Sequence, residues 1–226
     1  MEIEAGKAYA NGIDFISRKQ GFAIQARRNV NGEIVVSKVD LQEALKEHEN
    51  KIIKSWKQVL GIILISAFLT LTLHLQASFG VKLVVMIAVV WLATFGYFLV
   101  KSHQEEEYVK YRYHAAEHKA MNYVDRYHKA PRDIYAIRDT SSISYRCGTT
   151  LLAVVYVLTT LIIFSVVFLP LIWLKVIGCI FSFVIVFLLW ACGYLDFFQR
   201  FVTKKPTLSE LEVAYEGLLM YIHEIS

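Results

Sequence analysis

The sequence predicts an integral membrane protein that is mainly α-helical, with four transmembrane helices and a small α+β domain in the cytoplasm. Three observations lead to this fold class. Hydrophobic residues make up 56% of the 226 residues and the mean hydropathy is +0.43, which is too apolar for an ordinary soluble domain. Four windows approach the roughly 20 apolar residues that cross a bilayer. Charged residues, at 19%, exclude a chain that is embedded throughout its length.

The four predicted spans are two pairs, each separated by a short connection. They are Val59–Gln76, Val81–Val100, Thr150–Leu169 and Leu171–Cys192. The last two form one long apolar run that is interrupted only by Pro170 and Lys175. We therefore expect two transmembrane hairpins.

The distribution of Lys and Arg indicates the orientation. These residues number 10 in 1–57, 9 in 101–148 and 3 in 196–226, whereas only Lys82 and Lys175 lie close to the two short connections. Basic residues accumulate on the cytoplasmic side of membrane proteins, so both termini and the central insert are expected there. The formal net charge of +4 reflects this bias. Because acidic residues are interspersed among the basic ones, we expect no nucleic-acid partner.

Five segments follow from this pattern. They are a cytoplasmic β-hairpin cap (1–40), a juxtamembrane helix with the first two spans (41–100), a cytoplasmic insert (101–148), the last two spans (149–195) and a cytoplasmic amphipathic helix (196–226). The first 50 residues are polar and lack the apolar core of a cleavable signal peptide.

The cap is predicted from a turn signal. Asn31-Gly32 lies between two stretches rich in β-branched and apolar residues, which is typical of a hairpin. Residues 8–16 are expected to add either another strand or an irregular loop. Asp40 with Glu43 predicts the start of a helix that continues through Trp56 into the first span.

The insert and the C-terminal segment are each expected to hold a helix. Residues 103–127 contain neither Gly nor Pro, and Pro131 marks a break before a loop over 132–145. Thr207 and Glu210 form a capping-box signal. The apolar residues that follow recur at helical spacing, which predicts an amphipathic helix; they are Leu208, Leu211, Tyr215, Leu218 and Ile222.

The candidate site is His114-Ala-Ala-Glu117-His118, a spacing shared with the inverted zincins. On a helix the two histidines lie on one face, where they can hold one zinc ion. Glu117 is the candidate general base for a bound water. Zinc needs a third protein ligand. Cys147 is the first candidate, followed by His128 and Glu212.

A structural interpretation competes with this one. Histidine and glutamate on a juxtamembrane helix often face solvent or bond to neighbouring backbone, and a single cysteine is more often a packing residue than a ligand. The other two cysteines, Cys179 and Cys192, lie in a predicted span. Three cysteines give no disulfide framework.

Several motifs resemble those of the YqhQ-like family of bacterial membrane proteins, in the same order and over nearly the whole chain. They are Gly6-x-Ala8-x-x-x-Gly12, Ala26-Arg27-Arg28, Tyr113-His114-Ala-Ala-Glu117-His118-Lys119, Arg146-Cys147-Gly148-Thr149 and Gln199-Arg200-Phe201. The resemblance implies a multi-pass protein of the bacterial inner membrane, described as a predicted metal-dependent enzyme. Two positions depart from the family pattern. Ser144-Tyr145 stands where His-Pro is typical, and Asn11 stands where Glu is typical.

The sequence thus favours a membrane protein with a zinc site at the cytoplasmic face, acting as a hydrolase on a membrane-proximal peptide or lipid. In this hypothesis His114, His118 and Cys147 bind zinc and Glu117 is catalytic. The alternative is a non-catalytic scaffold or accessory subunit of a larger membrane complex, with membrane-protein partners or as a homo-oligomer in the bilayer. A channel or transporter is disfavoured because the spans hold few polar residues.

Overall fold

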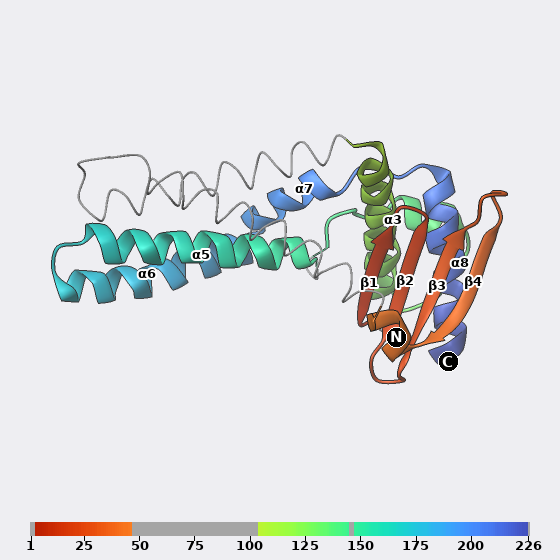
Figure 1. Ribbon diagram of the computed structural model, residues 1–226, viewed down its shortest axis with the longest axis horizontal. Coiled ribbons are helices and arrows are strands. Elements are labelled where there is room, and N and C mark those ends of the chain that lie inside the picture. The colour runs from red at the N-terminus through yellow and green to blue at the C-terminus, as the bar shows by residue number, and fades with distance from the viewer. Residues whose placement is uncertain (1–2, 47–103, 145–146, 226) are drawn as a thin grey trace. The chain divides into compact units, whose positions relative to one another are not determined.

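The computed structural model describes residues 3–46, 104–144 and 147–225 (Figure 1). The chain forms two compact units. The first comprises residues 1–50, 102–147 and 199–226, and the second comprises residues 51–101 and 148–198.

A four-stranded antiparallel sheet forms one layer of the first unit. Its strands follow one another in chain order: β1 (Ala5–Tyr9), β2 (Gly12–Ser17), β3 (Phe22–Arg28) and β4 (Ile34–Asp40). Phe15 pairs with Ile24 and Ile13 with Ala26, so alternate residues of β2 and β3 face the same side of the sheet. All four of these side chains are buried.

Two long helices cover that apolar face (Figure 1). Helix α3 (Glu105–Tyr127) packs on β1 and β2, and α8 (Leu208–Ile225) packs on β2, β3 and β4 and against α3. Gly217 permits the close approach of α8. A Cβ at that position would lie 2.8 Å from the Cβ of Ala26 and 3.1 Å from the ring of Phe15. Short helices α4 (Ile134–Arg138) and α7 (Gln199–Val202) complete the first unit.

The predicted helices of the first unit are confirmed. Helix α3 ends at His128, which adopts the left-handed conformation with φ 52°. At the start of α8, Glu210 accepts hydrogen bonds from the backbone N–H (2.7 Å) and the hydroxyl of Thr207. The first of these is the bond that the glutamate of a capping box makes. Leu211, Leu218 and Ile222 of the predicted stripe are buried.

The N-terminal cap is larger than the expected hairpin. Residues 8–16 supply the end of β1 and most of β2, and the turn between β3 and β4 spans five residues rather than two. A two-stranded ribbon is marginally stable in water. Four strands present a face wide enough to bury under two helices.

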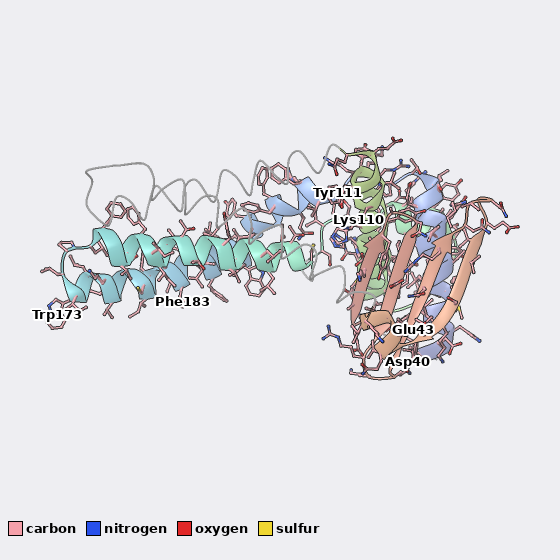
Figure 2. All side chains as sticks on the ribbon, in the orientation of Figure 1. Asp40, Glu43, Lys110, Tyr111, Trp173 and Phe183 are labelled. Atoms are coloured by element: carbon pink, nitrogen blue, oxygen red, sulfur yellow. The ribbon has the colours of Figure 1, made fainter. Side chains whose placement is uncertain are left out.

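The helix predicted to start at Asp40 begins there. The Asp40 carboxylate accepts a hydrogen bond from the N–H of Gln42 at 2.7 Å, and residues 41–46 are helical. Figure 2 shows Asp40 and Glu43 at this helix start. The expected continuation through Trp56 lies outside the described residues.

The second unit contains a helical hairpin. Helices α5 (Gly148–Phe168) and α6 (Ile172–Ala191) pack along each other, and the 3-10 helix η1 (Tyr194–Phe198) packs on both. Gly178 brings the helices close, since a Cβ there would lie 2.8 Å from Oγ of Ser165. The hydroxyl of Thr150 donates to Asp196 at 3.2 Å.

The expectation of a mainly α fold with four transmembrane helices is corrected. Within the described residues two helices are long and apolar enough to cross a membrane, Gly148–Val166 and Ile172–Ala191, beside a four-stranded sheet. The other two predicted spans lie outside the described residues. Hydropathy identifies long apolar runs. It carries no information on strand pairing, and the N-terminal segment forms its sheet through the pairing of β1 to β4.

The surface of α5 and α6 is apolar. Only 17% and 11% of the two span windows are buried within the chain, so most of their large side chains are exposed. Trp173 and Phe183 project from α6 in Figure 2. A surface this apolar needs a cover other than water.

A buried ion pair lies on the sheet face opposite the core. Asp14 of β2 is 1% exposed, and its carboxylate lies 2.5 Å from the guanidinium of Arg27. Burial raises the pKa of Asp14 above its usual value, although the charge of Arg27 opposes the rise. Arg27 also donates to the carbonyl of Ile13 at 3.0 Å.

We expect Arg27→Met to lower the free energy of unfolding by about 3 kcal/mol, because it leaves a buried carboxylate without its main partner. Arg138→Met is the matched control. The Arg138–Asp139 pair is 52% and 77% exposed, and its loss should cost less than about 1 kcal/mol. Chemical denaturation of both variants in detergent measures the difference. Equal costs would contradict the assignment.

A candidate metal centre

Helix α3 brings three polar side chains of the predicted site to one face. His114, Glu117 and His118 are spaced by three and four residues, so they lie one helical turn apart. The rings of His114 and His118 are 4.2 Å apart between centroids. The absence of Gly and Pro from α3 keeps this spacing fixed.

One ring nitrogen of each histidine is held by an oxygen acceptor. Nδ1 of His114 lies 3.0 Å from Oε2 of Glu117, and Nδ1 of His118 lies 2.7 Å from the backbone carbonyl of Ser142. Both acceptors favour the tautomer with hydrogen on Nδ1. In a neutral ring this leaves the lone pair on Nε2, which is the arrangement found in metal-binding histidines.

Cys147 completes a group of three ligand atoms. Its Sγ lies 3.5 Å from Nε2 of His114. The ligand atoms of His114, His118 and Cys147 all lie within 4.8 Å of one another. A tetrahedral zinc ion with Zn–S of about 2.3 Å and Zn–N of about 2.1 Å would separate sulfur and nitrogen by about 3.6 Å. The 3.5 Å distance between Sγ of Cys147 and Nε2 of His114 matches this separation.

The donor atoms are shielded from water to different extents. His118 is 2% exposed and Cys147 is 6% exposed, whereas the side chain of His114 is 24% exposed. The group therefore lies largely below the surface, and His114 is its most exposed member.

The charges of the cluster shift the pKa values of its members. Burial acts to lower the pKa of His114, but the Glu117 carboxylate and Cys147 raise it to about 10. Burial acts to raise the pKa of Cys147, but hydrogen bonds and charge from His114 and His118 lower it to about 5. Without metal, the pair is therefore a thiolate beside an imidazolium. A cation at the centre would replace the proton between them.

Glu117 is buried between His114 and strand β1. It is 3% exposed, and a Cβ on Gly6 would lie 2.4 Å from its Oε1. A larger residue at position 6 would force the Glu117 carboxylate to move. Gly6 belongs to the N-terminal motif of the resemblance, and in the structure it leaves space for the Glu117 side chain.

The segment 138–144 follows α4 and runs beside α3, and side chains hold its backbone. Lys119 donates to the carbonyls of Arg138 and Thr140, and Asn122 donates to those of Ser141 and Ile143. Together with the bond from His118 to Ser142, these contacts fix an irregular stretch of chain against the helix.

Gln199 holds the end of this segment. Its amide oxygen accepts from the N–H of Ser144 at 2.9 Å, and its amide nitrogen donates to the carbonyl of Ser144 at 2.8 Å. Lys119, Asn122 and Gln199 were not identified as site residues from the sequence. Lys119 and Gln199 stood in motifs of the resemblance, and Asn122 gave no signal.

The other two candidate ligands lie outside the cluster. His128 forms the C-terminal cap of α3, and Glu212 of α8 pairs with Arg28 at 2.9 Å. Neither belongs to the group of ligand atoms found among the described residues. Glu117, predicted as the general base, is bonded to His114. Its catalytic role stays a prediction.

Residues 23–195 match a protein family described as "Protein of unknown function (DUF1385)". The match covers more than half of the chain and is consistent with the resemblance to YqhQ-like proteins. No match was found among curated proteins or among solved structures. The comparisons therefore leave the activity to be argued from the site.

We expect the thiol of Cys147 to titrate near pH 5 in metal-free protein, below the usual value of about 8.5. Because ionisation of this thiol is favoured, thiolate absorbance should be present at pH 7 and disappear as the pH falls through about 5. The measurement is the ultraviolet absorbance of the chelator-treated protein minus that of Cys147→Ser. A difference that appears only above pH 8 would contradict the pairing with His114.

Proposed function

Because the chain belongs to the DUF1385 family, whose function is unknown, we propose its function from the site itself. The protein is a zinc-binding membrane protein that hydrolyses a peptide or lipid close to the membrane surface. One observation carries the proposal. Both histidines have Nδ1 bonded to an oxygen acceptor, and Nε2 of His114 lies against the Cys147 thiol.

The donor set favours zinc. Two imidazoles and a thiolate suit a borderline-soft divalent ion better than magnesium or calcium, which prefer oxygen. Three protein ligands are typical of catalytic zinc sites, where the fourth position binds water, whereas structural sites use four. Bound zinc supplies an activated water at neutral pH and polarises a carbonyl or phosphoryl group.

The residues of the chain hold the ion and orient its ligands. His114, His118 and Cys147 hold the ion, and Glu117 holds His114 in the binding tautomer through its Oε2. The sequence-based hypothesis also gives Glu117 the role of general base. That role requires the carboxylate to exchange its bond to His114 for one to the water during the reaction.

The apolar hairpin supports a location in a bilayer. The exposed side chains of α5 and α6 present about 20 residues of apolar helix each, the length that spans the hydrocarbon core. The Lys and Arg bias together with the resemblance supports the bacterial inner membrane, with the first unit in the cytoplasm. The bilayer is then the source of a nearby lipid or membrane-protein substrate.

A second candidate is a non-catalytic scaffold within a membrane complex. One observation favours it: Glu117 is buried, bonded to His114 and pressed against Gly6, as expected of a structural residue. In this function the cluster ties α3 to the segment that follows α4. Metal binding alone does not separate the two functions, but substitution of Glu117 does.

We expect the purified protein to contain about one zinc per chain, measured by elemental analysis in detergent. His114→Ala/His118→Ala should lose the metal, because both imidazole ligands are gone. His128→Ala is the matched control and should retain it, since His128 lies outside the cluster. Metal-free wild-type protein that is well folded, and that takes up no zinc on titration, overturns the proposal.

Glu117→Gln separates catalysis from positioning. The amide oxygen can still accept from Nδ1 of His114, so zinc should remain bound, with affinity lowered by roughly 10–100-fold. If Glu117 is also the general base, hydrolysis of a chromogenic ester or phosphodiester at saturating zinc should fall by at least about 100-fold. Full activity of the zinc-loaded variant contradicts the catalytic role. Inactivity of the wild type toward these probes and toward membrane peptides and lipids favours the scaffold.

A further inference from the structure

Gln199 is a fully buried polar residue whose side chain makes two hydrogen bonds to one backbone unit. It is 0% exposed, and its side-chain amide bonds to both backbone groups of Ser144, as a neighbouring β-strand would. Burying an amide in this way is costly unless each polar atom has a partner. The two bonds satisfy that requirement and fix the orientation of the Ser144 peptide groups.

The carbonyl of Ser144 links Gln199 directly to the cluster. It accepts from the Gln199 amide nitrogen at 2.8 Å and also from the N–H of Cys147 at 3.1 Å. One oxygen therefore joins the amide of Gln199 to the backbone of the thiol ligand. Two residues earlier, the carbonyl of Ser142 accepts from Nδ1 of His118.

The three ligands differ in what fixes them. His114 and His118 are held by the backbone of α3, a helix of 23 residues. Cys147 lies outside α3, directly before α5, and its backbone N–H donates to the Ser144 carbonyl, at the end of the segment 138–144 that side chains hold. Among the described residues, Gln199 is bonded to the same carbonyl as Cys147.

We propose that Gln199 is a positioning residue of the metal centre, which sets the distance between the Cys147 sulfur and the two histidine nitrogens through the Ser144 carbonyl. The inference rests on the proposed zinc site and adds to it a residue that touches neither the metal nor its ligands' side chains. Loss of the amide should weaken the bond from sulfur to metal more than the bonds from the histidines.

Cobalt substitution reports on each type of ligand separately. A thiolate bound to Co²⁺ gives a near-ultraviolet charge-transfer band, whereas the visible bands report the overall coordination of the ion. Gln199→Met keeps the volume of the side chain and removes both hydrogen bonds. Asn122→Leu is a second variant, which frees the carbonyls of Ser141 and Ile143 in the same segment. Leu218→Ala is a control for general destabilisation, because Leu218 is a fully buried core residue of α8.

The experiment titrates chelator-treated protein with Co²⁺ in detergent and measures the dissociation constant and both sets of bands. We expect Gln199→Met to bind at least about tenfold more weakly and to lose most of the charge-transfer band at concentrations that saturate the wild type. Asn122→Leu should show a smaller change in the same direction. Leu218→Ala, although less stable, should keep the wild-type spectrum.

The outcomes separate this role from the metal site. Wild-type protein that binds no cobalt overturns the site and the role together. Wild-type protein with the charge-transfer band, and a folded Gln199→Met with the same band and affinity, overturns the role of Gln199 alone. If Gln199→Met does not fold, an unchanged spectrum in Asn122→Leu has the same consequence. A loss of the band in Leu218→Ala equal to that in Gln199→Met would also reject a specific role.

Discussion

The two hydrogen bonds on the Nδ1 atoms of His114 and His118 are the constraint on which the site depends. A neutral imidazole can bind a metal through either nitrogen, and its ring can rotate. The Glu117 carboxylate and the Ser142 carbonyl remove both freedoms, since each binds one Nδ1 atom. The negative charge of Glu117 also makes His114 a better donor to a cation. Without these acceptors the same three residues would be an ordinary polar cluster.

The fold of the first unit holds the Glu117 acceptor in place. Glu117 is buried because β1 lies against α3, and glycine at position 6 leaves its carboxylate the room that a Cβ would take. A buried carboxylate without a partner is strongly unfavourable, so Glu117 and His114 stabilise each other's position. The sheet therefore does more than cover α3. Strand β1 packs against the Glu117 carboxylate and keeps it next to His114.

Local signals in the sequence were sufficient for the long helices α3 and α8 and for the grouping of His114, His118 and Cys147, and insufficient for the sheet and for α4. The spacing of His114 and His118 has meaning only on a helix, and a stretch free of Gly and Pro predicts one. The capping box at Thr207 is equally local. The pairing of β1 with β2 depends on contacts with α3 and α8, and no short pattern encodes it. The number of membrane-spanning helices was predicted from hydropathy alone; four were expected, and within the described residues two helices are long and apolar enough to cross a membrane.

Position 144 shows why a departure from a family pattern need not break a site. The YqhQ-like pattern typically has His-Pro where this chain has Ser144-Tyr145. Ser144 meets Gln199 and Cys147 through its backbone N–H and carbonyl, and any residue other than proline provides both groups. The chain leaves the first unit after Cys147 and returns at Gln199 after the whole apolar hairpin. The contact between Gln199 and Ser144 joins residues on either side of that hairpin in the sequence. Motif spacing cannot predict such a contact, yet in our proposal it controls the position of Cys147.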